Sequence, residues 1–219
     1  MKISINNTDI FYIREGSGCP FILLHGNGEN HTIFKDLIKK LSSSYTVYAI
    51  DSRNHGQSAK SEIFNYEIMS EDIIAFINAF KLERPILYGF SDGGIIGILI
   101  AIKYPFMLQK LIVSGVNIKP NGLKLHLLIY YFIKNLLFKD PLIKLMLKEP
   151  NIEKEQLQKI VIPVYLLVGT KDVIKRKHTL YINKHIKGSK LIVVDHATHD
   201  SYVFDNDQLY QLLKPILNQ

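Results

Sequence analysis

Short apolar runs recur along this chain, and most are separated by enough residues to form a helix. The runs are rich in Ile, Leu and Val, a pattern typical of strands that are buried on both faces of a parallel sheet. The predicted strands cover 20–24, 45–50, 85–88, 110–114, 163–168 and 190–194. Near the start, 2–5 and 10–14 alternate in polarity around a polar turn, which predicts an opening β-hairpin.

Between these runs, apolar residues recur with helical spacing. The predicted helices cover 32–41, 66–80, 94–103, 175–185 and 208–217. Alternating strands and helices indicate an α/β fold, with a mostly parallel, twisted, doubly wound sheet and helices on both faces. A chain of 219 residues with a mean hydropathy of +0.07 can bury about 70% of its unfolded surface, which favours a single domain over 1–219.

The turn at 89–94 carries the most informative chemistry, because it places Ser91 between glycines, after a predicted strand and before a predicted helix. This setting is typical of a nucleophile elbow. The strand and the helix approach so closely there that the flanking positions must be small, and the serine backbone is strained. We therefore predict that Ser91 is a nucleophile. The alternative is an ordinary glycine-rich turn.

Ligands of open α/β sheets bind at the carboxyl ends of the strands. Asp172 follows the run 163–168, and His199 follows the run 190–194. A serine hydroxyl is a weak nucleophile, so it needs an imidazole to take its proton and a carboxylate to hold that imidazole in the right tautomer. Ser91, Asp172 and His199 occur in the chain order of a Ser–Asp–His triad.

Neighbouring residues compete for two of these roles. His196 lies three residues before His199, and both Asp195 and Asp200 adjoin a histidine. We favour His199 as the base. We favour Asp172 as the acid because it comes from a different strand end, whereas a carboxylate on the same loop usually points elsewhere.

The backbone N–H groups of Asn27 and Asp92 are the predicted oxyanion hole. Asn27 follows His25 and Gly26 at the end of the first parallel strand. We interpret His25 as a hydrogen-bonding brace of that loop and not as a proton carrier.

His25 with Gly26, the segment 51–58, the elbow, Asp172 and the late His199 resemble the α/β-hydrolase family over essentially the whole chain. The stretches 89–105 and 185–191 are similar to its serine-nucleophile branch of valacyclovir hydrolase and biphenyl hydrolase-like esterases. The resemblance implies that Asp92 favours substrates with an α-amino group; the alternative is a carboxylate that only starts a helix. Relatives with an aspartate nucleophile, such as haloalkane dehalogenases, are disfavoured by Ser91.

The segment 51–58 departs from the family in one residue, because Asn54 stands where glycine is usual. Asn tolerates the left-handed conformation, so we expect the turn to survive. The segment lacks the glycine and lysine pattern of a phosphate cradle, and we interpret it as structural.

The resemblance also implies a small helical cap, inserted over 116–159. The apolar stretch 123–138 and lysines at 124, 134, 139, 144 and 148 predict one or two amphipathic helices. A lid of this kind would bring Tyr130 to an apolar acyl group, whereas the alternative is a helix that only covers the sheet. Contact with lipid is disfavoured because Lys134 and Asn135 interrupt the apolar stripe.

Composition limits the partners. The formal charge of +7 is spread along the chain, which indicates solubility and no nucleic-acid binding. Cys19 is the sole cysteine and the first residues lack a signal-peptide core, so a cytoplasmic location is predicted. No apolar run is long enough to predict a membrane span. Scattered histidines predict no metal, and the triad needs no cofactor.

The predicted function is that of a carboxylesterase-like serine hydrolase, which cleaves a small ester through an acyl-enzyme on Ser91. Thioesters and C–C bonds would suit the same groups. A receptor on this fold, which binds a ligand with little or no turnover, is the alternative from another class. The oligomeric state is left open.

Overall fold

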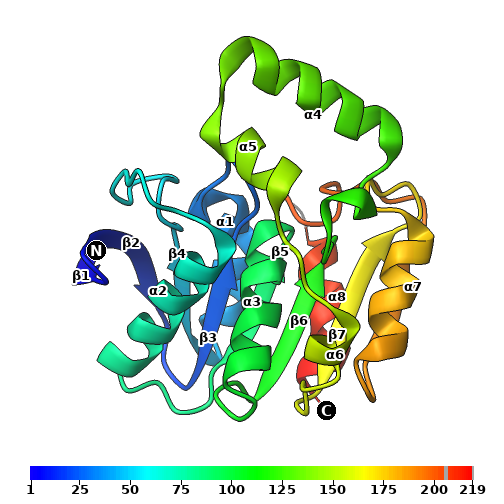
Figure 1. Ribbon diagram of the computed structural model, residues 1–219. Helices are drawn as coiled ribbons and strands as arrows, with labels where there is room; N and C mark the ends of the chain where they lie inside the picture. Colours follow the sequence, from blue (N-terminus) through cyan, green and yellow to red (C-terminus); the bar gives the residue numbers. More distant parts are fainter. Residues whose placement is uncertain (205–206, 219) are drawn as a thin grey trace.

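An eight-stranded sheet with helices on both faces forms the body of the protein, as seen in a computed structural model that describes residues 1–204 and 207–218 (Figure 1). The strand order is β1-β2-β4-β3-β5-β6-β7-β8. The strands from β3 onward are parallel, whereas β2 is antiparallel to both β1 and β4. The bounds are β1 Lys2–Ile5, β2 Thr8–Glu15, β3 Cys19–Leu24, β4 Tyr45–Ile50, β5 Ile86–Phe90, β6 Lys110–Ser114, β7 Val164–Gly169 and β8 Lys190–Val194. The predicted fold class and the opening hairpin are confirmed.

Helices cover both faces of the sheet, as the sequence predicts. Buried side chains of α2, α3 and α7 pack in the core of one face, and those of α1 and α8 pack in the core of the other. The bounds are η1 His31–Phe34, α1 Lys35–Leu41, α2 Tyr66–Ala79, α3 Asp92–Lys103, η2 Pro120–Gly122, α4 Leu125–Phe138, α5 Pro141–Lys148, α6 Lys154–Leu157, α7 Arg176–His185 and α8 Gln208–Leu217. The helix predicted over 32–41 begins instead as the 3₁₀ turn η1, where the Asn30 side chain accepts a hydrogen bond from the Thr32 N–H.

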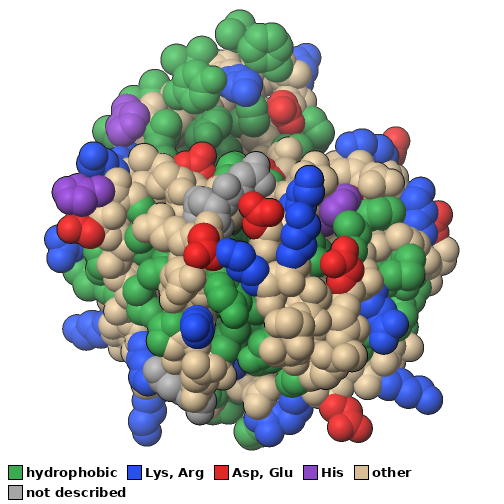
Figure 2. All heavy atoms as spheres, turned by 180° about the vertical axis from the view of Figure 1, so that it is seen from behind, with side chains coloured by type: hydrophobic (Ala, Val, Ile, Leu, Met, Phe, Trp, Pro, Cys, Tyr) green, Lys and Arg blue, Asp and Glu red, His purple; other side chains and the backbone are tan. Residues whose placement is uncertain are grey.

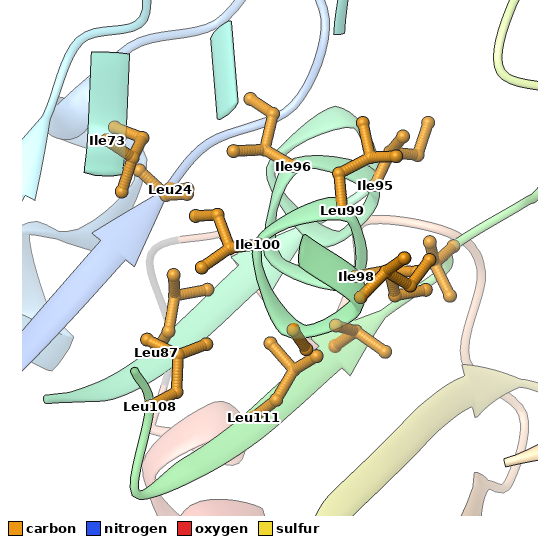
Figure 3. Packing of buried hydrophobic residues seen from close by; sticks show 14 of the residues in the cluster. Leu24, Ile73, Leu87, Ile95, Ile96, Ile98, Leu99, Ile100, Leu108 and Leu111 are labelled. Carbon is orange, nitrogen blue, oxygen red and sulfur yellow. The ribbon is translucent and has the colours of Figure 1, made fainter. Parts of the chain in front are cut away.

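The helix α3 is the centre of the larger core. Every residue from 92 to 102 is buried, because α3 lies on the middle of the sheet. Figure 3 shows the α3 residues Ile96 and Ile100 among Leu24 of β3, Leu87 of β5 and Leu111 of β6. Burial of each such side chain contributes about 1.5–3 kcal/mol, so the start of α3 is held rigidly against the end of β5.

The segment after β4 is a buried structural loop. The Asp51 carboxylate accepts a hydrogen bond from the His31 N–H at 2.7 Å. Arg53 forms two hydrogen bonds of 2.6 Å with the carboxylate of Asp72 on α2, and both side chains are buried. Asn54 adopts a left-handed φ of 66°, which agrees with the expectation that the turn tolerates Asn.

The 3₁₀ turn η2 and the three α-helices α4, α5 and α6 lie in the connection between β6 and β7. Figure 1 shows α4 above the carboxyl edge of the sheet, away from its two faces. None of the residues of α4 is buried. The division into one domain over 1–219 with a cap over 116–159 stays a prediction. Within 1–204 and 207–218, no helix is long and apolar enough to span a membrane.

Candidate active site

Ser91 occupies a strained turn between β5 and α3. Its φ of 50° and ψ of −111° lie outside the ordinary regions for an L-residue, and its N–H donates to the Ser114 carbonyl at 2.8 Å. A Cβ atom at Gly93 would lie 2.3 Å from the Leu24 carbonyl oxygen, so this position requires glycine. The tight packing of backbone on backbone holds the Ser91 side chain at the sheet's carboxyl edge.

The structure brings Ser91, His199 and Asp172 together. Ser91 Oγ lies 3.2 Å from His199 Nε2, and His199 Nδ1 lies 2.8 Å from Asp172 Oδ1. The Asp172 side chain is 1% exposed and that of His199 is 20% exposed. The Phe90 ring contacts the imidazole, with 5.0 Å between ring centroids. The three side chains therefore form a continuous hydrogen-bonded chain that opens to solvent on the serine side.

The competing residues on the β8 loop lie elsewhere. The side chains of His196 and Asp195 are 85% and 79% exposed. Asp200 accepts a hydrogen bond from the Thr198 hydroxyl at 2.9 Å. Among these candidates, only His199 reaches Ser91, since the loop turns at His196 with a left-handed φ of 56°.

Sequence analysis missed Gly115, which supports the histidine. A Cβ atom there would lie 2.5 Å from Cε1 of His199, and the φ of this glycine is 60°. Gly115 follows β6 directly, so its place at a strand's carboxyl end was the signal that could have identified it.

Two backbone N–H groups are available beside Ser91. At the start of α3, the N–H of Gly93 donates to the His25 carbonyl, and those of Gly94 and Ile95 donate to the Ser91 carbonyl. The N–H of Asp92 is left without an acceptor in the described part of the chain. The Asn27 N–H also has no acceptor among the described residues. Asn27 and Asp92 line the same cavity as Ser91.

The His25 side chain holds the loop that carries Asn27 in place through hydrogen bonds. His25 Nε2 accepts from the Ser52 N–H at 3.0 Å, so its proton is on Nδ1, which lies 2.8 Å from the Gly26 carbonyl. Burial, with the nearby His55, lowers the pKa of His25 to about 4. The imidazole is therefore neutral at neutral pH, as a brace requires, and it does not contact Ser91.

Asp92 begins α3 with its carboxylate buried. One oxygen accepts from Asn27 Nδ2 at 3.0 Å and the other from the Tyr66 hydroxyl at 2.8 Å. Burial raises the pKa of Asp92, and these two hydrogen bonds oppose that rise. An amino group of a substrate would have to share the oxygens with Asn27 and Tyr66.

A cavity of about 580 Å³ opens at Ser91, which is the size range of small-molecule sites. Its walls come from the loop at 27–29, the β7 and β8 loops, α4 and α5. Tyr130, the predicted substrate contact, is 54% exposed and does not line this cavity, so the structure does not bring it to Ser91. Tyr131, one position further and about 100° around α4, lines it instead.

Glu29 is a second residue that sequence analysis missed. It lines the cavity, and its Oε2 atom accepts from the Gly26 N–H at 2.9 Å. Burial raises the pKa of Glu29 to about 7, although that hydrogen bond acts in the opposite direction. Its position two residues after Asn27 was the available signal. Within 1–204 and 207–218, no group of three His, Cys, Asp or Glu side chains could hold a metal ion.

A parallel sheet that carries a strained serine, a histidine and a buried aspartate at its carboxyl edge is the architecture of an α/β-type hydrolase. The family model for the alpha/beta hydrolase fold matches residues 20–136. The chain therefore belongs to the α/β-hydrolase fold family.

Known proteins agree with this membership. The human serine hydrolase BPHL is 26% identical over 250 aligned residues, which cover 99% of this chain and 85% of that protein. The zebrafish (Danio rerio) sn-1-specific diacylglycerol lipase ABHD11 is 28% identical over 59% of this chain and 41% of its own length. An esterase structure from Exiguobacterium antarcticum superposes with a TM-score of 0.85 at 20% identity, over 99% of this chain and 97% of that one. That structural likeness concerns the fold alone.

Proposed function

We propose that the protein is a serine hydrolase that cleaves a small carboxylic ester through an acyl-enzyme on Ser91. The observation that carries the proposal is the hydrogen-bonded chain from Ser91 Oγ through His199 to the buried Asp172, with distances of 3.2 and 2.8 Å. The human relative, which is named a serine hydrolase, supports the same class of chemistry.

Each residue has one role in the proposed reaction. Ser91 Oγ attacks the carbonyl carbon while its proton passes to His199 Nε2, and Asp172 stabilises the imidazolium that forms. The N–H groups of Asn27 and Asp92 donate to the oxyanion, each contributing about 3 kcal/mol. The tetrahedral intermediate then expels the alcohol, which takes the proton from His199.

Water completes the proposed cycle. It loses a proton to His199 Nε2 as its oxygen attacks the acyl carbon, and the second tetrahedral intermediate releases the carboxylic acid and restores the Ser91 hydroxyl. A cavity of about 580 Å³ suits a small substrate, and Tyr131, Leu142 and Met146 supply apolar surface for its acyl group.

Labelling with a fluorophosphonate at neutral pH tests the nucleophile. We expect rapid modification of Ser91, located by peptide mass spectrometry, and no modification in Ser91→Ala, in His199→Ala or after heat denaturation. His196→Ala is the matched control, because it removes a histidine from the same loop, and it should label like the native protein. Labelling that persists in His199→Ala or is absent from the folded native chain would overturn the proposal.

A panel of esters, thioesters and diketones separates the remaining candidates. Turnover of several unrelated short esters supports the esterase, and selective turnover of a thioester or a diketone assigns a thioesterase or a C–C hydrolase instead. Tight ligand binding with negligible turnover would assign a receptor. The cytoplasmic location remains a prediction, which fractionation of cells would test.

A further inference from the structure

The outward side of α4 is almost entirely apolar. Residues at helical spacing, 125, 129, 132 and 136, share one stripe, with 133 and 137 beside it. Each of these side chains is between 51% and 71% exposed. Figure 2 shows hydrophobic side chains gathered at the top of the molecule, where Figure 1 places α4. His126 is the exposed polar residue on this side.

Two other polar residues of α4, Lys134 and Asn135, lie away from the stripe. Lys134 lines the cavity beside Ser91, and the Oδ1 atom of Asn135 is buried. These two residues therefore do not interrupt the apolar stripe, which corrects the interpretation drawn from the sequence. α4 therefore exposes an apolar side, whereas an ordinary helix of a globular protein turns its apolar side toward the core.

Such a surface is unusual for a protein surrounded by water. A soluble chain rarely exposes a contiguous apolar patch formed by six large side chains, and a patch of this kind marks an interaction site. The helix contacts α5 and η2, and neither of these elements covers the outward stripe.

The charges around the stripe indicate what covers it. Lys124 and Lys139 cap the two ends of α4; Lys124 is partly exposed, and Lys139 is exposed, as are Lys144 and Lys148 on α5. Lys134 lines the cavity, and the four other lysines between 124 and 148 are accompanied by one acidic residue, Asp140. A second copy of the chain docked here would bring these lysines together, whereas an anionic surface would pair with them.

We propose that α4 docks in the plane of an anionic phospholipid surface, with its apolar stripe at the acyl boundary and its terminal lysines among the headgroups. A helix with one apolar side and lysines at its margins is the form that lies in a membrane interface without spanning it. Tyr130, which is 54% exposed beside the stripe, supplies the amphipathic ring favoured at headgroup depth. This proposal does not depend on the catalytic one.

Flotation of the full chain with vesicles tests the proposal. We expect binding to mixed phosphatidylcholine and phosphatidylglycerol vesicles, and much weaker binding to phosphatidylcholine alone. Phe132→Ser with Leu136→Ser should lower partition to the mixed vesicles by more than about tenfold. Phe106→Ser with Val161→Ser is the matched control, because these apolar side chains are 74% and 60% exposed outside the cap, and it should bind like the native chain.

Charge reversal gives the second arm. Lys124→Glu with Lys139→Glu should lower binding to the mixed vesicles by about tenfold or more and leave binding to phosphatidylcholine unchanged. Lys184→Glu with Lys187→Glu, exposed on and after α7, is its control. Equal binding by the native and stripe variants would overturn the proposal. A native chain that ignores vesicles but forms a dimer in ultracentrifugation, lost in the stripe variant, would assign the face to a second copy.

Discussion

Replacement of Asp172 by Asn removes one charge from the candidate site and leaves the shape of the side chain almost unchanged. Asp172 Oδ1 lies 2.8 Å from His199 Nδ1, and it also accepts from the Ile174 N–H at 2.9 Å. Because that N–H requires an acceptor, the Asn side chain should keep its oxygen toward His199. The imidazole would then keep its proton on Nδ1, with Nε2 still facing Ser91.

The expected loss of activity is therefore the loss of the charge interaction. When His199 takes the serine proton, the imidazolium and carboxylate charges are about 4 Å apart, and at an effective dielectric constant of about 20 they attract by about 4 kcal/mol. At 1.4 kcal/mol per factor of ten, roughly, this amounts to about 1,000-fold in kcat/KM. Asp172 does not line the cavity, so we expect the loss in kcat and little change in KM.

Hydrolysis of p-nitrophenyl acetate at neutral pH measures this effect, with thermal unfolding as the check on folding. Asp195→Asn is the matched control, because it removes a charge from the exposed part of the β8 loop, and it should keep native activity. The reasoning is refuted if Asp172→Asn keeps more than about a tenth of kcat, or if Asp195→Asn loses as much.

Three further predictions concern stability. Asp72→Ala should lower the free energy of unfolding, measured in urea, by about 3–5 kcal/mol, because it leaves the buried guanidinium of Arg53 without its carboxylate. Glu71→Ala removes one partner of an exposed ion pair and should lower it by less than about 1 kcal/mol. Gly93→Ala should lower the free energy of unfolding by more than about 3 kcal/mol and abolish fluorophosphonate labelling of Ser91. Gly188→Ala is the control: its Cβ atom meets no atom within 4 Å, so it should lower the free energy of unfolding by about 1–2 kcal/mol, through its positive φ alone. For Glu29, the pKa raised to about 7 by burial means that the folded state holds a proton that the unfolded chain loses near pH 4.5. The stability of the native chain relative to Glu29→Gln should therefore fall as pH rises from about 4.5 to about 7, by at most about 3 kcal/mol, and a flat or rising difference in urea titrations would contradict it.

The strands and the candidate triad were accessible to sequence analysis because they follow from local patterns. Short apolar runs locate the ends of the parallel strands within two residues, and those ends meet at one edge of the sheet. Ser91, Asp172 and His199 each come soon after such a run, so their convergence could be predicted from topology alone. The split of 32–41 into η1 and α1 could not, since it depends on one hydrogen bond of the Asn30 side chain.

The walls of the cavity were not accessible in the same way. Glu29 points into the cavity because its loop closes on itself through the Gly26 N–H, and the sequence does not state the direction of a loop side chain. Tyr66 reaches Asp92 from α2, whose position relative to α3 depends on how the two helices pack against each other and the sheet. Contacts of this kind follow from tertiary structure and not from local propensity.

The orientation of α4 could not be predicted from hydrophobic periodicity. Periodicity establishes which residues share a side of a helix, but not which side faces the protein. For α3 the answer follows because the helix lies directly on the sheet and its residues from 92 to 102 are all buried. The inward side of α4 borders a cavity with charged walls instead, so Lys134 is favoured there, and the apolar stripe has no core to join. Transfer of the outward side from water to a less polar environment would remove this exposed apolar surface from water, which is the physical basis of the docking that the vesicle experiment tests.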